Sequence, residues 1–474
     1  MNSIERKEQR YLRRKQKREQ KRTGLCDKTY DEVFNFLNLY KAGKGCCEDV
    51  RWKTSTINYE TSLLTNIEYL DNEMQNFKNN RKHCFDGFKH FITYEHSKKR
   101  DINALTIKDR TKQRCFCDNV MTKAYSRSYI TDNGASLPGK GITFTIDKLK
   151  YYLQEHYRRY GLEGGILQFD FSGYFASIPH KLAKERACKH LTDNDLQDLS
   201  SSFIDEFLEL REIEQEDKNN THGVGLGSQV SQNIALDAAD PLDHYIKEKY
   251  KVKGYARYMD DGYIISNSLD ELKQVEETIF KLSEKYGLKI SKKKTKITPF
   301  KNHSFVFLKL RIRLQENGVV TVKINRKRLK AQRRKMRLFK TWIEDENSNF
   351  SFEDVATSFA SWRGYIKRHS NSYKTLHKFD KTFIEMYKEE LAEYRRKIKC
   401  SFDAIWTEDY GWIYYENESN KKKILDKLDK EYYNRRNNGF VPLCNRYDYY
   451  SKEENISNKA MAFRLFRNTI KLCV

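Results

Sequence analysis

The segment YARYMDDGYIIS, residues 255–266, places two adjacent acids, Asp260 and Asp261, between two apolar and aromatic-rich runs. Two neighbouring carboxylates repel each other unless a cation shares their site. Asp and Gly are also ordinary turn-forming residues, so a plain hairpin turn is the alternative explanation. The spacing alone therefore leaves a metal site and a turn as two open hypotheses.

A third acid favours the metal site. Asp170 closes an apolar run in GGILQFDF, residues 164–171, which begins with a double glycine and is typical of a buried strand. If this strand lies beside the 255–266 hairpin, Asp170 and Asp260 can face one another. Mg²⁺ takes oxygen ligands and is commonly held by few carboxylates together with substrate phosphates. Two such ions would stabilise the attacking and leaving oxygens of a phosphoryl transfer.

The surrounding sequence predicts the elements that must position these acids. The runs before Met259 and after Gly262 predict two strands of a hairpin with the acids at its tip. Residues 87–146 mix short strands with Gly turns, and residues 304–324 predict a β-hairpin with its turn at 316–318. Helix-like apolar spacing recurs in the other long stretches, 30–85, 180–214, 269–291 (where a strand follows the helix) and 325–397.

The charge balance indicates a polyanionic partner. The chain has 474 residues, which suggests two to four structural units, and it carries a formal charge of +24 from 90 Lys and Arg against 66 Asp and Glu. Nucleic acid is the commonest partner of such a basic protein. A basic soluble protein from an AT-rich genome is the alternative explanation.

Cysteine usage and hydropathy limit the compartment. The ten cysteines are scattered, and neither Cys46-Cys47 nor Cys115-Phe116-Cys117 has the spacing of paired zinc ligands. Without a secretory signal, reduced thiols in a cytoplasmic protein are expected. No apolar run approaches the roughly 20 residues of a membrane-spanning helix, so no membrane partner is expected. The basic segment 1–24 is either a nucleic-acid-binding arm or a solvated helix.

The order of several motifs resembles the palm of reverse transcriptases. These motifs are FDFSGYF, GVGLGSQVSQ, YMDD, LKISKKKT and FVFLKL. Upstream, KKRDINALTIKDRTKQ and DNGASLPGKG resemble the fingers segments of the bacterial branch. That branch includes group II intron, retron, diversity-generating and phage-defence enzymes. The resemblance covers roughly residues 90–395, and its specificity lies in the order of the motifs, because each of them alone is weak.

The resemblance implies an α+β fold of the right-hand polymerase type, with fingers, a palm built on an antiparallel sheet, and a helical thumb. Helical extensions are expected at both ends. The implied divisions are a basic N-terminal helical extension at 1–86, fingers at 87–160, palm at 161–324, thumb at 325–397 and a C-terminal extension of unknown role at 398–474.

The resemblance also implies the metal site. Asp170 and Asp260 resemble the metal-binding pair, with Asp261 as the supporting acid and the backbone carbonyl of Phe171 as a further ligand. Two Mg²⁺ ions are implied, and Mn²⁺ could substitute. Phe175 stands where the family keeps an aromatic gate against the ribose 2′-hydroxyl, with plain core packing as the alternative.

Further positions resemble the nucleotide-binding residues of the family. Arg100 looks like the fingers arginine, although Asp101 replaces a proline, and Lys99 could share its phosphate contact. A solvated basic turn is the alternative for this lysine. Leu226 departs from the Gln of many accurate relatives, which predicts low or unusual fidelity, while the adjoining Gly227 would permit close backbone approach.

A lysine near the leaving pyrophosphate is implied within SKKKTKI, residues 291–297. We take Lys293 as its representative, although the sequence does not choose between this residue and its two lysine neighbours. A surface charge run is the alternative. In FVFLKL, Lys309 stands where the family usually has glycine, so the local backbone is expected to differ.

The implied function is that of an RNA-directed DNA polymerase that adds deoxynucleotides to a primer. Its partners would be an RNA template, the DNA product and dNTPs. A bacterial or phage-borne enzyme with a dedicated noncoding RNA, in antiviral defence, is the expected setting. A template-independent or protein-primed polymerase of the same fold, and an RNA-binding maturase-like scaffold, are the alternatives. Template, primer and oligomeric state stay open.

Overall fold

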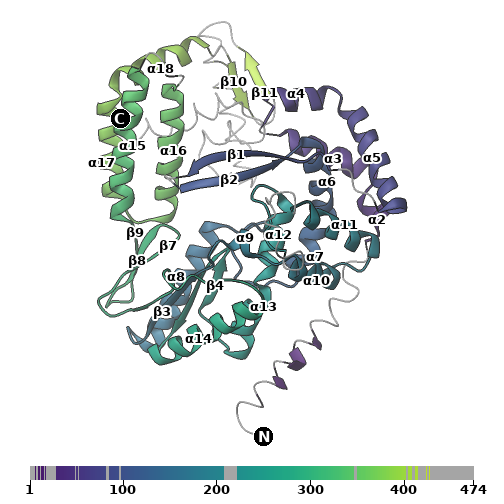
Figure 1. The fold of residues 1–474 in the computed structure, drawn as a ribbon. Helices are drawn as coiled ribbons and strands as arrows, with labels where there is room; N and C mark the ends of the chain where they lie inside the picture. The colour runs from purple at the N-terminus through teal and green to yellow at the C-terminus, as the bar shows by residue number, and fades with distance from the viewer. Residues whose placement is uncertain are drawn as a thin grey trace. The chain divides into compact units, whose positions relative to one another are not determined.

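A computed structural model describes residues 28–48, 50–51, 53–81, 85–95, 98–207, 221–345, 348, 350–401, 404–407 and 411–414, with isolated positions between 6 and 17 and at 423 and 426. The chain divides into two compact units. The first comprises Met1–Leu308 and Arg313–Val320, and the second Lys309–Ile312 and Thr321–Val474 (Figure 1). Most of the predicted basic arm at 1–24 falls outside the described residues.

A four-stranded antiparallel sheet in the first unit carries the predicted acids. Its strand order is β4-β5-β3-β6. The strands are β3 (Gly165–Asp170), β4 (Tyr255–Tyr258), β5 (Asp261–Ser266) and β6 (Lys296–Pro299). The register pairs Asp170 with Asp261 and Leu167 with Ile264. Because side chains alternate between the two faces of a strand, Asp170 and Asp261 share one face, opposite to that of Leu167 and Ile264.

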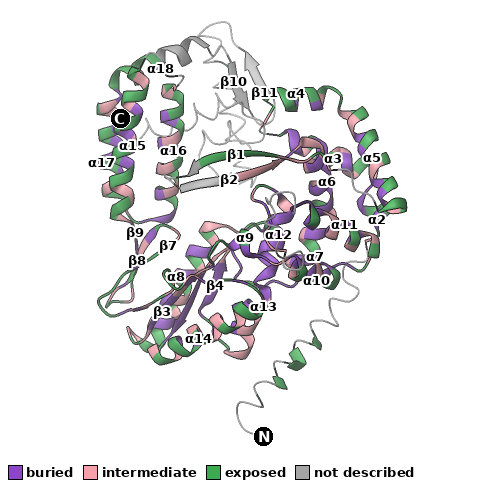
Figure 2. Ribbon diagram, in the orientation of Figure 1, coloured by how far each residue is buried: buried purple, intermediate pink, exposed green. Residues whose placement is uncertain are grey.

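Helix α14 (Leu269–Lys285) covers the Leu167 face of this sheet. Its buried residues Leu272, Val275 and Ile279 recur at helical spacing and belong to one core with Leu167 and Ile264. The Ser268 hydroxyl caps the helix by accepting a hydrogen bond from the Glu271 N–H. Strands β3, β4 and β5 are buried over most of their length, whereas β6 at the edge is only partly buried (Figure 2).

The other helices of the first unit build the surroundings of the sheet. They are α2 (Tyr30–Val33), α3 (Phe36–Cys47), α4 (Thr54–Thr61), α5 (Leu63–Asn80), α6 (Ile107–Phe116), α7 (Thr122–Ser126), α8 (Ile142–Tyr160), α9 (Tyr174–Ser177), α10 (His180–His190), α11 (Asn194–Asp205), α12 (Gln229–Ala238) and α13 (Asp240–His244), with π-helical turns η1 (Cys117–Met121) and η3 (Tyr245–Lys249).

The expectation of short strands and Gly turns over residues 87–146 is correct only for its first part. Strands β1 (Phe88–Glu95) and β2 (Lys98–Leu105) form an antiparallel hairpin, but α6, η1 and α7 follow. The buried face of α6 is largely polar, with Thr111, Lys112 and Gln113 all inaccessible. Lys112 is paired there with Glu73 at 2.7 Å. Because the buried face of α6 is polar, its sequence lacks the apolar periodicity by which a helix is predicted.

The second unit is mainly helical. A three-stranded sheet of β7 (Phe305–Phe307), β8 (Leu310–Leu314) and β9 (Val320–Ile324) contains the point where the chain passes from one unit to the other. The helices are α15 (Arg326–Glu344), α16 (Phe352–His369), α17 (Tyr373–Met386) and α18 (Lys388–Ser401). Phe359 and Phe383 stack at 4.1 Å between ring centroids within its core, and Trp362 packs on Phe379 at 4.9 Å.

The expected hairpin at 304–324 is present, but its first arm is divided. Between β7 and β8, Leu308 and Lys309 both have positive φ, 43° and 69°. This is the conformation that glycine adopts without strain, and Leu308 and Lys309 adopt it here with side chains. Beyond α18, strands β10 (Ala404–Thr407) and β11 (Gly411–Tyr414) pair antiparallel, and the rest of 398–474 lies almost entirely outside the described residues. None of the described helices has the length and apolar character that a membrane crossing needs.

The contact between Gly262 and Phe169 gives a packing prediction. A Cβ added at Gly262 would lie 2.3 Å from the Phe169 ring, whereas nothing lies within 4 Å of one added at Gly364 in α16. We expect Gly262→Ala to destabilise the first unit by about 1–3 kcal/mol through overpacking. The matched change Gly364→Ala should stabilise its helix by up to about 1 kcal/mol. Denaturant unfolding of both variants measures this, and an unchanged Gly262→Ala midpoint would contradict the packing.

Candidate active site

Three carboxylates converge where β3 ends and β5 begins. Asp170 is the last residue of β3 and pairs in register with Asp261, the first residue of β5. Asp260 occupies the turn before β5, and its backbone carbonyl accepts a hydrogen bond from the Phe171 N–H at 3.2 Å. The hairpin and the neighbouring strand predicted from the sequence therefore bring the acids together on adjacent strands.

The crowding of these acids is visible in the ionisation of Asp261. Burial, together with the negative charges of Asp260 and Asp170, raises its pKa to about 7. The positive charge of Lys294 opposes the shift. Like charges this close cannot all ionise without a cation, so the site attracts positive charge.

Lys294 supplies that charge in this structure. Its Nζ donates to Oδ1 of Asp170 at 2.6 Å, and Asp170 raises the pKa of the lysine. The segment carrying Lys294 is fixed by the Ser291 N–H, which donates to the Asp170 carbonyl at 2.8 Å. All three lysines in SKKKT are exposed, and Lys294 is the one with a described bond to a site acid. A pyrophosphate contact of Lys293 stays a prediction.

The donor set fits a divalent cation. Within the described ranges, no group of three or more His, Cys, Asp or Glu side chains is arranged to hold a metal ion as it stands. The Lys294 ammonium stands in for a cation on Asp170, so this ion pair must open for a metal to bind. Hard oxygen donors whose mutual repulsion already raises the pKa of Asp261 are the set that Mg²⁺ prefers.

The turn carrying Asp260 has a strained backbone, and a buried arginine holds this backbone in place. Met259 adopts a left-handed φ of 54°, which is uncommon for a residue with a side chain. The Nη1 group of the fully buried Arg257 donates to the Met259 carbonyl at 2.7 Å, and its other donors reach Asp243. Sequence reasoning missed this arginine. An arginine inside an otherwise apolar strand was the available signal, because a buried guanidinium requires a buried acid.

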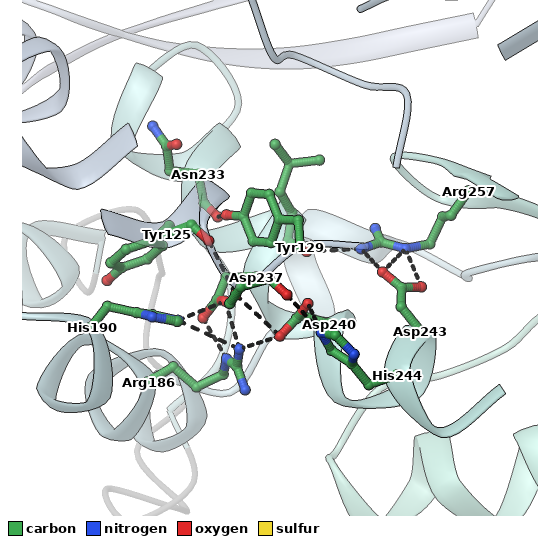
Figure 3. Close-up of polar contacts among 12 residues, drawn as sticks. Tyr125, Tyr129, Arg186, His190, Asn233, Asp237, Asp240, Asp243, His244 and Arg257 are labelled. Atoms are coloured by element: carbon green, nitrogen blue, oxygen red, sulfur yellow. Dashed lines mark hydrogen bonds and ion pairs between the residues drawn. The ribbon is translucent and has the colours of Figure 1, made fainter. Parts of the chain in front are cut away.

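A second buried ion cluster supports the helices beside this turn (Figure 3). Arg186 of α10 contacts both Asp237 and Asp240, and the Asp237 carboxylate also meets the His190 ring at 2.9 Å. The charges of Arg186 and His190 hold the pKa of Asp237 well below its usual range against the effect of burial. The cluster joins α10 to α12 and α13 without contacting the three site acids in any described bond.

Phe175 lies five residues after Asp170, on the short helix α9 that follows β3. Its ring is half-buried and meets Tyr174 edge-on at 6.1 Å between centroids. Its carbonyl accepts a hydrogen bond from the Val224 N–H at 2.8 Å. The segment GVGLGSQ is thereby fixed beside α9, as the two motifs would have to be if they met one nucleotide.

Leu226 and Gly227 lie against strand β2. The Leu226 carbonyl accepts a hydrogen bond from the Asn103 N–H at 3.3 Å. Gly227 has a φ of 128°, and a Cβ added there would come within 3.2 Å of the Asn103 carbonyl oxygen. The close neighbour of Gly227 in the structure is therefore the backbone of β2, and the approach of a nucleotide to Gly227 stays a prediction.

Lys99 and Arg100 lie on β2, opposite Tyr94 and Thr93 of β1. Their side chains are outside the described part of the structure, so their phosphate contacts stay predictions. In the described part of β1, residues 89–93 are exposed. This accessibility suits a strand that meets a ligand.

The family comparison agrees with this geometry. Residues 81–312 match the family model described as reverse transcriptase (RNA-dependent DNA polymerase). The sheet, the three acids and the GVGLGSQ segment all lie inside the match, so this part of the chain is similar to reverse transcriptase domains. The predicted α+β fold class of the right-hand polymerases is confirmed. Among curated proteins, none matches the chain.

Solved structures similar to the chain include fungal telomerases. Telomerase from Candida albicans in complex with a fragment of telomeric RNA shares 13% identity over 70% of this chain and 58% of that one, with a TM-score of 0.39. A truncated apo telomerase from Candida tropicalis shares 14% over 50% and 55%, with a TM-score of 0.37. The apo enzyme from that organism shares 12% over 67% and 59%, with a TM-score of 0.34. This chain spans less than two thirds of each.

The raised pKa of Asp261 predicts a pH-dependent penalty on stability in the absence of metal. A carboxyl whose folded pKa exceeds its unfolded value loses stability as pH rises through the folded pKa, here about 7. We expect Asp261→Asn to raise the thermal midpoint in chelator at pH 8, by about 2–4 °C for each kcal/mol removed, with the gain shrinking toward pH 4.

Thermal unfolding at pH 8 and pH 5 in chelator measures this effect. Asp270→Asn is the matched control, because the Asp270 side chain is 84% exposed and pairs only with Lys273 among its described contacts. The difference in thermal midpoint between Asp270→Asn and the wild type should be the same at pH 8 and pH 5. Equal midpoints for Asp261→Asn and wild type at pH 8 would contradict the crowding of the acids.

Proposed function

We propose that this protein is an RNA-directed DNA polymerase that adds deoxynucleotides to a primer by phosphoryl transfer. The observation that carries the proposal is the register pairing of Asp170 with Asp261, beside Asp260, inside the region that is similar to reverse transcriptase domains. Phosphoryl transfer depends on positioning and on neutralising charge, so carboxylates on rigid strands are the feature it needs.

Asp170, Asp260 and Asp261 would hold two Mg²⁺ ions, with the Phe171 carbonyl as a further ligand. When bound, the metal neutralises charge on the attacking and leaving oxygens of the transfer. The chain contributes rigid placement of the carboxylates, which comes from the β3–β5 register. Lys294 is 59% exposed on its side chain, so it can leave Asp170 and turn toward a phosphate group. A lysine freed in this way can donate a proton to the leaving pyrophosphate.

Phe175 would select deoxynucleotides. Its ring is half-buried, and its backbone is tied to Val224, so it cannot retreat easily from a sugar placed beside the acids. Leu226 offers an aliphatic side chain where a Gln would offer hydrogen bonds, which supports low or unusual fidelity. Arg100 and Lys99 on the exposed hairpin would hold the triphosphate, with Lys293 near the pyrophosphate.

The second unit offers a surface for the nucleic-acid backbone. Helix α15 exposes four cations at helical spacing on one face: Arg326, Lys330, Arg333 and Arg337. Cations in such a row can follow successive phosphates, and each phosphate neutralised makes binding more sensitive to salt. An RNA template and DNA product are the proposed partners. A dedicated noncoding RNA, a bacterial or phage origin, antiviral defence and a cytoplasmic location complete the proposal.

Loss of one site acid tests the proposed chemistry. We expect Asp260→Ala to lower dNTP incorporation on a primed RNA template by about a thousandfold or more, because a lost metal carboxylate forfeits several kcal/mol of transition-state stabilisation. Asp270→Ala, an exposed acid in the same unit, should incorporate at the wild-type rate. Single-nucleotide extension in Mg²⁺ gives both rates, and incorporation that survives Asp260→Ala would overturn the assignment.

Sugar selection tests the role of Phe175. Phe175→Val should raise the ratio of ribonucleotide to deoxynucleotide kcat/KM by about tenfold or more, since a smaller side chain leaves room for a 2′-hydroxyl. Phe280→Val is the matched control, because Phe280 also packs half-buried against the same core. The gate assignment fails if the wild type uses both sugars equally or if both variants shift the ratio alike.

A further inference from the structure

Arg257 is a buried charge whose donors are divided between two parts of the domain. It lies on β4 and is fully inaccessible to solvent. Its Nε and Nη2 groups donate to the Asp243 carboxylate at 2.9 and 2.7 Å, and Nη2 also donates to the Leu236 carbonyl at 2.8 Å. Nη1 donates to the Met259 carbonyl at 2.7 Å. A buried guanidinium is tolerated only where its donors are paired, so each bond constrains the others.

The bond to Met259 acts on the peptide that leads into Asp260. Met259 has a φ of 54°, a conformation that a side chain makes unfavourable. Such strain persists only where surrounding groups hold the backbone in place. Arg257 provides this restraint, because its Nη1 fixes the direction of the Met259 carbonyl and hence the orientation of the next residue.

The other bonds of Arg257 attach the turn to the helices behind it. Leu236 belongs to α12, which begins immediately after the loop that carries Leu226. Asp243 belongs to α13 and also accepts a hydrogen bond from the Tyr255 hydroxyl. Figure 3 shows Arg257 paired with Asp243. Through its bonds to the Leu236 and Met259 carbonyls, the same guanidinium connects the helix behind the candidate nucleotide loop with the turn that presents the acids.

We propose that Arg257 is a positioning residue for metal binding, which fixes the strained Met259–Asp260 peptide so that the site acids meet a divalent cation. The inference rests on the proposed function, because it assigns metal binding to those acids. Groups that hold metal ligands in place change metal affinity by about 10–100-fold when they are removed.

General stabilisation of the core is the competing explanation, and Arg186 is its control. Arg186 is also buried, at 6% exposure, and pairs with Asp237 and Asp240 on the same helices. None of its described bonds reaches the turn. Losing it should destabilise the fold much as losing Arg257 does, without affecting the peptide before Asp260.

The experiment measures Mn²⁺ binding without nucleotide, by electron paramagnetic resonance, at a temperature where each variant is folded by circular dichroism. Arg257→Gln should weaken Mn²⁺ binding by about tenfold or more. Arg257→Lys should fall between wild type and Arg257→Gln, because an ammonium lacks the planar fork that serves both partners. Arg186→Gln should lower the thermal midpoint and keep the wild-type Mn²⁺ affinity.

A double variant separates positioning from loss of charge. Glycine accepts positive φ without strain, so Met259→Gly added to Arg257→Gln should recover part of the lost Mn²⁺ affinity. Wild-type Mn²⁺ affinity in folded Arg257→Gln, or equal weakening in Arg186→Gln, overturns the proposal. If Arg257→Gln does not fold, the Mn²⁺ affinity of Arg257→Lys is compared with those of the wild type and Arg186→Gln instead.

Polymerisation assays distinguish a failure of this inference from a failure of the proposed function. With dNTP and Mg²⁺, Arg257→Lys should lower kcat while changing KM little, as expected when site geometry rather than nucleotide affinity is disturbed. A wild-type protein that binds Mn²⁺ but incorporates no nucleotide would defeat the polymerase proposal, and the Mn²⁺ comparison between Arg257 and Arg186 variants would still judge the positioning role.

Discussion

Repulsion among Asp170, Asp260 and Asp261 is the constraint on which the geometry of the candidate site depends. The β3–β5 register forces two of these carboxylates opposite one another, and the turn adds the third. Burial and like charge together raise the pKa of Asp261 to about 7. A chain can maintain such a cluster only if the strands cannot separate, and the apolar pairing of Leu167 with Ile264 against α14 provides that rigidity.

Two cations contact this group of acids in different ways. Lys294 pairs with a carboxylate, and Arg257 holds the backbone of the turn that carries Asp260. Lys294 meets Asp170 directly, and its side chain is 59% exposed, so water can replace the contact at little cost. Arg257 is fully buried, is paired with Asp243 and touches only the backbone of the acidic turn. The exposed lysine is suited to exchange with a ligand, whereas the buried arginine is suited to hold geometry. Replacing one by the other would not preserve either property.

The sequence was sufficient where local pattern and chemistry coincide. The strand ending at Asp170 and the hairpin around Asp260 both follow from apolar runs and turn residues. The helix following β2 could not be predicted in this way, because Lys112 and its neighbours bury polar groups satisfied by distant partners such as Glu73. The choice of Lys294 also depends on tertiary placement, since the three adjacent lysines have equivalent local sequence.

The contact between β2 and the GVGLGSQ segment constrains residue 227 more than the side chain of residue 226. Leu226 is held through its backbone carbonyl, which accepts from the Asn103 N–H, so the bond would survive any change of side chain. Gly227 combines positive φ with a 3.2 Å approach to the Asn103 carbonyl oxygen, and a side chain there would disturb both. The fold therefore fixes the loop at Gly227 through its backbone, whereas the bond at Leu226 places no demand on the side chain.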